Sequence, residues 1–587
     1  MTTDQSPVPA TVCIVGCGPA GAMLGLLLAR SGIPVVVLEK YPDFHRDFRG
    51  DTIHASTLQV LDELGLMPGF DRLPHQPTRT LGMMTDDGIV TLGDFSRLPG
   101  SFQYLSMVPQ WDFLDFLTAE AAKYPTFTLL RPAEVTGLIV DRDVVRGVRY
   151  ATAGGAHELR AALTIACDGR HSAVRAAAGL AVKEYGVPLD VLWFRIPRQS
   201  DDPAGSFARL GPGRLYPLID RGSYWQAAAT MPKGRYGTLR SAGIDAFRAD
   251  LRRWLPFSAD RIDSAVQTWD DTGFLEVRVN RLRRWHRPGL LCIGDAAHAM
   301  SPIAGVGINL AIQDAVAAAN LLTEGLRRGA VTDGELAAVQ RRRALPAILT
   351  QQIQLRVQRQ MIAGGGDPDA PVHLPRPLRL LSRVRPLQRL FSRFLAIGVR
   401  NEHVAPLQPA GGSVRVRARP VVTTGLLAGA LPRVDWSDAY AVPRPDGTPS
   451  DPQVWSDAIF HQAPRWVRHL LAARQATVGL VGIDRGRPGT FATRTRTEHE
   501  VLLGTDERHL SFRVSVRTEL DRVTLCTVVQ LHNRRGRAYF ALVRAFHPII
   551  VRAVLGRAAG TLHGSDARNL HRTDSDNRLL TDQGVHR

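Results

Sequence analysis

The sequence predicts an α/β protein: a Rossmann-like N-terminal domain, a β-sheet region interleaved with it, a helical segment, and a separate α+β domain at the C-terminus. Three features support this prediction. They are a glycine-rich turn between two apolar strands near the N-terminus, two later strand ends carrying an Asp-Gly or Gly-Asp pair, and a change of composition after about residue 406. With 587 residues, 44% of them hydrophobic, the chain is long enough to bury a large core in several domains.

The first element is a βαβ unit over residues 11–40. Apolar strands are expected over 12–15 and 35–38, with an apolar helix over 19–30 between them. The turn before the helix contains Gly16, Gly18, Pro19, Ala20 and Gly21. In a dinucleotide-binding unit the first glycine allows the turn, the second lets backbone NH groups approach a pyrophosphate, and the third lets the helix pack close to the strand.

The second strand of this unit ends in Glu39, which Lys40 follows. A carboxylate at this position accepts both hydroxyls of an adenosine ribose and repels a 2′-phosphate. The strand, helix and acid in register therefore predict a dinucleotide site. The alternative interpretation is a glycine-rich turn in some other α/β domain.

The formal net charge is +18. The arginines are scattered among acidic residues, and neither a long basic block nor a zinc-finger spacing accompanies them. We attribute the excess of arginine to the base composition of the genome, and we expect no nucleic-acid partner. Attraction to anionic substrates or membrane surfaces stays open.

The cysteines form no CxxC pair, so a disulfide framework is not expected. A signal-peptide pattern is lacking at the N-terminus, and no uninterrupted apolar run reaches membrane-spanning length. We therefore expect a cytoplasmic protein without a transmembrane segment. No metal site is predicted, because Glu498, His499 and Glu500 would alternate between the two faces of a strand.

Between the βαβ unit and the next block, the pattern predicts a helix over 56–64, a hairpin over 81–98 and a helix beginning near Gln110. Arg49 lies in the loop before the first of these helices. Its guanidinium would reach a phosphate or flavin edge if the loop folds back, whereas a solvated arginine is the simpler interpretation. Apolar runs near 193–196 and 224–230 predict a sheet whose aromatic residues either roof a pocket or fill a core.

Two further blocks follow strands. The strand over 163–166 runs into Asp168 and Gly169, and the strand over 290–293 runs into Gly294 and Asp295. After the second strand we expect a Gly/Pro loop and a long helix capped by Asn309. This helix start would place backbone NH groups beside an electron-rich ring edge; its residues include Gly305, Gly307 and Ile308.

Together, the GCGPAG turn with Glu39, the CDGRHSAVR block and the IGDAAHAMSP block with GVGIN resemble the group A FAD-dependent monooxygenases with the para-hydroxybenzoate hydroxylase fold. The resemblance covers roughly the first 400 residues. It implies that Glu39 binds the adenosine ribose and that Asp295 binds the ribityl chain. It also implies that Arg49 and Gln110 hold the pyrophosphate and ribityl region, that Asp168 fixes the pyrophosphate side of the groove, and that Pro302 lies near the reactive flavin face.

The resemblance further implies that NADH or NADPH reduces FAD, that O2 adds to it, and that a C4a-hydroperoxide transfers one oxygen atom to a small aromatic or polyketide-like substrate. No catalytic base is assigned. His298, near Asp295, is the best histidine candidate, although a packed histidine is the simpler interpretation.

The expected FAD-binding domain comprises residues 1–75, 105–180 and 281–335, and the substrate-binding sheet comprises 76–104 and 181–280. A helical segment over 336–405 and a Pro/Gly-rich linker over 406–432 follow. Residues 433–563 resemble a helix-grip domain, with a helical pattern over 455–480, strands over 510–520, 523–531 and 538–543, and a helix with Pro548 in its first turn. Residues 564–587 are expected to be a disordered tail.

Alternative functions are a reductase or halogenase of the same fold, and a flavoprotein that sequesters a hydrophobic ligand without turnover. The Trp-x-Trp-x-Ile-Pro signature of tryptophan-type halogenases is absent, since Trp193 to Pro197 reads WFRIP. The residues leave open the substrate, the choice between NADH and NADPH, hydroxylation versus Baeyer-Villiger insertion, the role of the C-terminal domain, and the oligomeric state.

Overall fold

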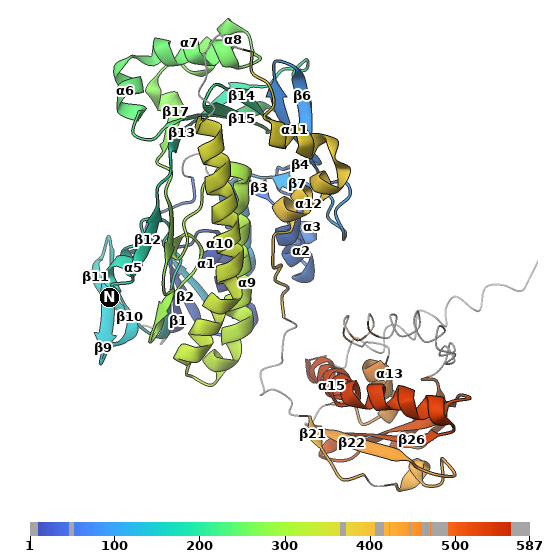
Figure 1. Cartoon of the computed structure of the whole chain (residues 1–587). Coiled ribbons are helices and arrows are strands. Elements are labelled where there is room, and N and C mark those ends of the chain that lie inside the picture. Colours follow the sequence, from blue (N-terminus) through green and yellow to red (C-terminus); the bar gives the residue numbers. More distant parts are fainter. Residues whose placement is uncertain are drawn as a thin grey trace, which may run out of the picture. The chain divides into compact units, whose positions relative to one another are not determined.

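Strand β1 (Ala10–Val15) lies inside a mostly parallel sheet in the computed structural model of the chain (Figure 1). It pairs in parallel with β2 on one side and with β11 on the other. Strands β1 and β2 and the second half of β11 are apolar and mostly buried, as expected where both faces of a sheet are covered. In order of pairing, the sheet contains β19 (His286–Arg287), β20 (Leu290–Cys292), β11 (Gly155–Ala166), β1, β2 (Val35–Leu38) and β8 (Phe127–Leu130), and β9 (Glu134–Asp141) and β10 (Val144–Thr152) extend it beside β11.

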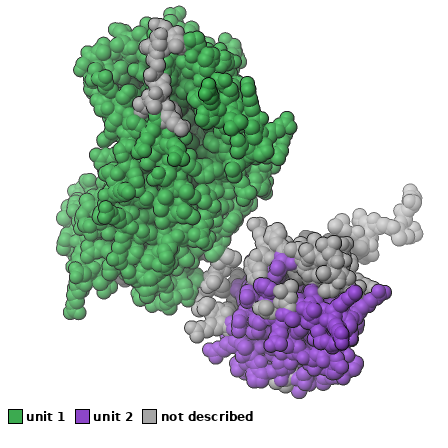
Figure 2. All heavy atoms as spheres, in the orientation of Figure 1, with its two compact units in different colours: residues 1–406 green, residues 407–587 purple. Residues whose placement is uncertain are grey.

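The structure describes residues 10–45, 52–363, 371–405, 416–421, 423–444, 448–460, 464, 467, 470 and 491–564. The chain divides into two units, Met1–Pro406 and Leu407–Arg587, which Figure 2 shows in different colours. The predicted fold class is confirmed: unit 1 holds the parallel sheet and a second sheet, and unit 2 is an α+β domain.

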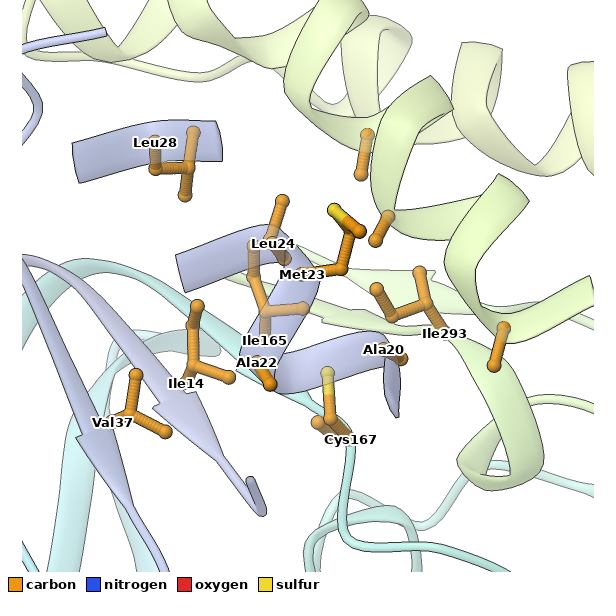
Figure 3. Close-up of a cluster of buried hydrophobic side chains, with 14 of the residues drawn as sticks. Ile14, Ala20, Ala22, Met23, Leu24, Leu28, Val37, Ile165, Cys167 and Ile293 are labelled. Carbon is orange, nitrogen blue, oxygen red and sulfur yellow. The ribbon is translucent and has the colours of Figure 1, made fainter. Parts of the chain in front are cut away.

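Helix α1 (Pro19–Arg30) packs on the parallel sheet between α4 (Gln110–Ala121) and α9 (Val306–Arg327). Because neighbours cover several of its sides, every residue from Ala20 to Ala29 is buried, and the helix is apolar nearly all round. Figure 3 shows the buried cluster in which side chains of this helix meet those of the strands; it includes Ile14, Met23, Leu24, Ile165 and Ile293.

The second sheet draws its strands from two separate parts of the chain. In order of pairing they are β17 (Thr272–Leu275), β13 (Leu189–Pro197), β16 (Tyr224–Pro232), β15 (Arg214–Asp220), β14 (Phe207–Gly211), β5 (Thr80–Thr85) and β6 (Gly88–Asp94). One face packs against α7 and α8 through an aromatic core; the helices beside this sheet are α6 (Tyr236–Ser241), α7 (Ile244–Trp254) and α8 (Ala259–Ala265).

Three helices complete unit 1. Helix α10 (Asp333–Ala363) packs along α9, whereas α11 (Arg376–Arg383) and α12 (Arg385–Ala396) contact β6. Short elements connect the two sheets; they are β3 (Thr52–Ile53), α2 (Ala55–Glu63), α3 (Met67–Phe70), β4 (Gln76–Thr78), β7 (Leu105–Met107), α5 (Ala173–Ala177), β12 (Val182–Tyr185) and β18 (Val279–Leu282).

Unit 2 is an antiparallel sheet packed against a long helix. The strands, in order of pairing, are β21 (Arg417–Ala418), β22 (Trp436–Pro443), β26 (Arg522–Leu531), β25 (Leu510–Thr518), β24 (Glu500–Asp506) and β23 (Thr493–Arg496). Helices α13 (Pro452–Phe460) and α15 (Arg534–Gly564) bury an apolar core against one face of this sheet. The rest of the helical pattern expected over 455–480 lies almost wholly outside the described residues.

Two expectations for unit 2 are wrong. Residues 538–543 are not a strand but part of α15, where Phe540 packs in a cluster with Trp436 and Leu531. Periodicity cannot separate a short apolar strand from one turn of a buried helix. The helix bends by 62° between Arg534–Ala541 and Phe546–Leu562, so Pro548 lies in the first turn after the bend.

The second error concerns the linker, because its described part belongs to unit 2. Strand β21 pairs with β22, and Leu427 and Leu431 are buried on the opposite face of the sheet from α15, beside Cys526 and Val528. The proline and glycine content of this stretch predicted a linker. Its leucines instead cover one face of the sheet. Both faces of the sheet in unit 2 are therefore covered.

One helical stretch among the described residues, Ile303–Arg327, is long and apolar enough to cross a bilayer, but 72% of its most apolar window is buried. The apolar face of α9 packs against α1, α2 and α10. An apolar helix that is mostly buried among other helices is typical of the core of a folded domain.

Candidate functional site

A cavity of about 1,390 Å³ lies between the strand ends of the parallel sheet and the second sheet. Its wall contains many of the residues that the sequence assigns to a cofactor: Gly18, Pro19, Ala20, Lys40, Gln110, Asp168, Gly169, Asp295, Pro302, Gly305, Gly307 and Ile308. Five candidates lie behind the wall, namely Gly16, Gly21, Glu39, Gly294 and Asn309. Arg49 lies outside the described residues. The three sequence blocks thus meet at one cavity, because the carboxyl ends of parallel strands share one edge of the sheet.

The glycines of the first turn meet three different demands. Gly16 has φ +93°, and a Cβ there would lie 2.6 Å from the carbonyl oxygen of Cys167. A Cβ on Gly21 would lie 2.0 Å from the carbonyl oxygen of Gly16. At Gly18, by contrast, a Cβ would meet no described atom within 4 Å, so a side chain there would project into open space beside the cavity.

Glu39 braces this turn from behind. Its side chain is 4% exposed; Oε2 accepts a hydrogen bond from the backbone N of Cys17 at 2.9 Å, and Oε1 accepts one from the backbone N of Tyr41 at 3.1 Å. The carboxylate thereby fixes the path of the chain on both sides of the strand end.

Arginines tie the second block to the third. The guanidinium of Arg175 donates to the carbonyl oxygens of Arg170, at 2.7 Å, and of Ala296, at 3.1 Å. Arg170 also lies 3.8 Å from the carboxylate of Asp295. Sequence reasoning missed this role of Arg175, although it belongs to the CDGRHSAVR block and is buried.

Asp168 holds its own block together: Oδ2 accepts a hydrogen bond from the backbone N of Val174 at 3.1 Å. Burial raises the pKa of this carboxyl group, and hydrogen bonds from the residues that follow it oppose the shift.

The start of α9 differs from the expectation. The helix begins at Val306 with Gly305 as the N-cap at φ +61°, so Asn309 lies inside its first turn. The Asn309 amide oxygen accepts from the backbone N of His54 at 2.8 Å and from Oγ1 of Thr57 at 2.7 Å, and its Nδ2 donates to the carbonyl oxygen of Thr52 at 3.0 Å. Asn309 therefore joins two helix starts instead of capping one.

Two helix starts suit a dinucleotide with an electron-rich ring. Gly18 caps α1 and Gly305 caps α9, and neither cap makes a side-chain hydrogen bond within the described chain. Backbone NH groups in the first turn of each helix, which on α1 begin at Ala20 because Pro19 has none, therefore lie at the positive end of a helix without a side-chain cap. Both caps line the cavity, so the chain fits a pyrophosphate at one helix and a flavin edge at the other.

His298 does not reach the cavity, so the structure does not support its expected place at the flavin face. Its Nε2 lies 2.5 Å from Oδ2 of Asp314, and its ring packs against Trp285. Asp314 also accepts from the backbone N of Gly294 at 3.1 Å and from Nε of Arg343 at 2.9 Å. Burial favours the neutral acid, but His298 and Arg343 outweigh it and lower the pKa of Asp314.

This buried network was not predicted. An aspartate inside the apolar run of α9 signals a buried partner, but its partner Arg343 lies 29 residues further along the chain, on α10. Arg343 also lies 3.3 Å from Oε1 of Glu402. The network supports the Gly294-Asp295 block from behind, and its charges are paired as buried charges must be.

Pro302 lines the cavity in a loop that α10 holds. The side chain of Gln354 donates through Nε2 to the carbonyl oxygens of Ser301, at 3.1 Å, and Ile303, at 2.9 Å, and its oxygen accepts from the backbone N of Ser301 at 3.3 Å. One turn earlier, Gln351 donates to the carbonyl oxygen of Ala299 at 3.0 Å. These amides bracket Pro302 on both sides.

The other half of the cavity is apolar and comes from the second sheet. Trp193 lines it, and its indole Nε1 is buried with no acceptor among the described residues. Phe194 and Trp225 lie in the core beneath. The predicted aromatic strands therefore both line a pocket and fill a core. Further apolar wall residues are Leu81, Met83, Val191, Phe207 and Leu215.

Comparison with known proteins assigns residues 9–352 to a family described as FAD binding domain, and residues 430–554 to a family described as protein of unknown function, DUF2867. The chain is 35% identical over 393 residues to the 6-methylpretetramide 4-monooxygenase of Streptomyces rimosus, covering 66% of this chain and 92% of that relative.

Two solved structures share the fold. OxyS anhydrotetracycline hydroxylase from Streptomyces rimosus matches with 23% identity and a TM-score of 0.53, over 68% of this chain and 78% of that one. The flavin-dependent halogenase CmlS matches with 20% identity and a TM-score of 0.55, over 68% and 74%. At these identities the likeness is one of fold alone.

Gly18→Asp is expected to abolish flavin binding, because it places a side chain and a negative charge where a pyrophosphate would approach the start of α1. Flavin content of the purified protein, read from its visible spectrum, measures the effect. Gly154→Asp, in an exposed hairpin turn, is the control and should keep its flavin. Normal flavin content in Gly18→Asp would contradict the assignment of the turn.

Arg343→Leu is expected to destabilise unit 1 by roughly 3–5 kcal/mol, because it leaves buried carboxylates of Asp314 and Glu402 without their shared cation. Urea unfolding followed by tryptophan fluorescence measures the change. Arg342→Leu removes the more exposed partner of the same Glu402 and should cost clearly less. Equal effects of the two substitutions would show that burial of the ion pair is unimportant.

Proposed function

The chain belongs to the FAD binding domain family and is an FAD-dependent monooxygenase, and on this premise we propose that it hydroxylates a fused-ring aromatic substrate of the polyketide class. The observation that carries the proposal is the continuity of the cavity. One half is lined by the glycine turn and both helix starts, and the other half is an apolar chamber under the second sheet. A cofactor ring held by the first half would face a substrate held by the second.

The size of the cavity fits a site shared by a dinucleotide and a substrate. Typical ligand pockets measure about 300–1,000 Å³, and this cavity of about 1,390 Å³ has to hold a dinucleotide as well as the substrate. A flat polycyclic molecule suits walls of leucine, valine and aromatic side chains. The buried indole NH of Trp193 supplies a directed donor for a carbonyl or phenol oxygen of such a molecule.

Bound FAD supplies the redox chemistry, in which NADH or NADPH provides two electrons, one oxygen atom of O2 enters the substrate and the other leaves as water. The chain's part is binding and orientation. We assign the pyrophosphate to Gly18, Pro19 and Ala20, with Lys40 and Gln110 beside them, and the adenosine ribose to Glu39. The backbone NH groups after Gly305 would stabilise negative charge at the ring edge.

Around the ring, Asp295 is assigned to the ribityl chain and Pro302 to the reactive face. Asp168 and Gly169 shape the pyrophosphate side of the groove. The apolar chamber would keep water away from the reacting atoms, which favours transfer of oxygen to the substrate over side reactions with water. We place the reaction in the cytoplasm, in keeping with five cysteines that are all buried and free of disulfides.

The test starts with the visible spectrum of the purified protein, recorded without oxygen before and after addition of NADH or NADPH. Flavin bands that bleach, followed by incorporation of one 18O atom from 18O2 into an anthracycline- or tetracycline-type polyphenol, are the expected result. Turnover of simple monocyclic phenols alone would contradict the proposed substrate class. Failure to bind FAD would contradict the function as a whole.

Gln354→Leu is expected to lower the rate of product formation roughly ten- to a hundredfold, because the carbonyl oxygens on both sides of Pro302 lose the hydrogen bonds from Gln354 and the loop shifts at the reacting face. Flavin content should stay normal, while the product formed per NAD(P)H oxidised should fall. Gln352→Leu, exposed on the same helix, is the control. Unchanged coupling in Gln354→Leu would rule out a positioning role for this amide.

A further inference from the structure

Helices α11 and α12 carry a dense positive charge that nothing in the described chain neutralises. Residues 371–400 contain seven arginines and no acidic residue. The six arginines within the two helices are exposed, and none forms an ion pair with another described residue; they are Arg376, Arg379, Arg383, Arg385, Arg389 and Arg393. The buried Arg343 of the same unit, by contrast, pairs with Asp314 and Glu402.

Exposed leucines accompany these arginines. Leu380, Leu387 and Leu390 are 56%, 41% and 65% exposed, and Ile89 on the adjoining strand β6 is 46% exposed. Single exposed apolar side chains are common, but four on neighbouring elements form a patch that needs a partner. We call this surface, made of the six arginines and the three leucines, the α11–α12 face.

Helical geometry places most of these side chains, namely the arginines with Leu380 and Leu390, on one side of each helix. At about 100° per residue, Arg385, Arg389 and Arg393 fall within about 80° of one another around α12. Leu390 follows about 60° further round, whereas Leu387, which is 41% exposed, lies between the directions of Phe394 and Phe391 at the border of the inward side. On α11 the three arginines span about 60° and Leu380 lies about 40° beyond Arg376, so the face is cationic and apolar at once.

The opposite side of α12 is occupied inside the protein. Phe391, Phe394 and Leu395 line the cavity, and the Ser392 hydroxyl accepts from the backbone N of Asp94 at 3.0 Å. Gln388 donates to the carbonyl oxygen of Thr91 at 3.0 Å. The exposed leucines are thus not needed to anchor α12, because the inner side of this helix already packs in unit 1.

We propose that the α11–α12 face docks on an anionic membrane surface. Charge complementarity selects an anionic partner, and the leucines, which a phosphate backbone would not use, select a lipid surface with an accessible apolar layer. A second copy of the chain meeting this face with its own would bring like charges together. Helices of 8 and 12 residues lie on a bilayer rather than cross it.

Docking would also place the apolar chamber near the lipid, because α12 separates the two. An apolar substrate dissolved in the bilayer would then have a short path to the cavity. The proposal concerns a surface, so it stands apart from the identity of the substrate and from the reaction.

The test is flotation of the full-length, flavin-loaded protein with vesicles. Phosphatidylcholine vesicles containing phosphatidylglycerol should carry the protein at low salt, and pure phosphatidylcholine vesicles should not. High salt should weaken the binding. No binding to the anionic vesicles would overturn the proposal.

Two sets of variants separate charge from apolar contact. Arg379→Gln/Arg383→Gln/Arg389→Gln should weaken the partition roughly a hundredfold or more, and Leu380→Gln/Leu387→Gln/Leu390→Gln should weaken it at least about tenfold. The matched controls are Arg146→Gln/Arg235→Gln/Arg240→Gln and Leu345→Gln/Ile549→Gln/Leu520→Gln, all exposed elsewhere. Flavin content and melting temperature verify that each variant is folded.

Single-stranded RNA serves as the competing polyanion. The protein could bind RNA as tightly as the anionic vesicles, and the leucine substitutions could leave its affinity for both unchanged. In that case the face is a general polyanion surface and the membrane proposal is wrong. Vesicle binding that depends on both arginines and leucines, with RNA binding that ignores the leucines, supports it.

Discussion

The close approach of α1 to the ends of β1 and β11 is the constraint on which unit 1 depends. Gly21 sits so near Gly16 that a single added carbon would lie 2.0 Å from a carbonyl oxygen. This contact directs the start of α1 at the edge where the parallel strands end. Every block that follows a strand of this sheet arrives at the same edge, which is why residues from three distant parts of the sequence share one cavity.

The second sheet turns this edge into a chamber. The chain leaves the parallel sheet twice, once for β5 and β6 and once for β13 to β17, and both excursions join one sheet. Its strands alternate between wall and core, so Trp193 lines the cavity while Phe194 fills the core beneath. Helix α10 then closes the arrangement by holding the Pro302 loop through Gln354.

Charge is distributed in two contrasting ways in unit 1. Behind the cavity, the buried carboxylate of Asp314 joins His298, Arg343 and the Gly294 backbone in one network, so its charge is held by these partners. On α11 and α12 the arginines stay exposed and unpaired within the described chain. The first arrangement fixes the geometry of the site, and the second leaves a surface available for a partner.

The sequence by itself determined the βαβ unit, the three glycine and aspartate blocks, the family resemblance and the two interleaved sheets, because these depend on local spacing and periodicity. It did not determine the cap of α9, the place of His298 or the state of residues 538–543. Asn309 is a good capping residue in isolation, but its partners are His54, Thr57 and Thr52, which lie more than 250 residues earlier. The pairing of Asp314 with Arg343, the bracket of Gln354 around Pro302 and the burial of Leu427 are likewise contacts between distant segments. Only the tertiary structure decides such contacts, since the energy of a buried polar group or a covered sheet face depends on what the rest of the chain brings to it.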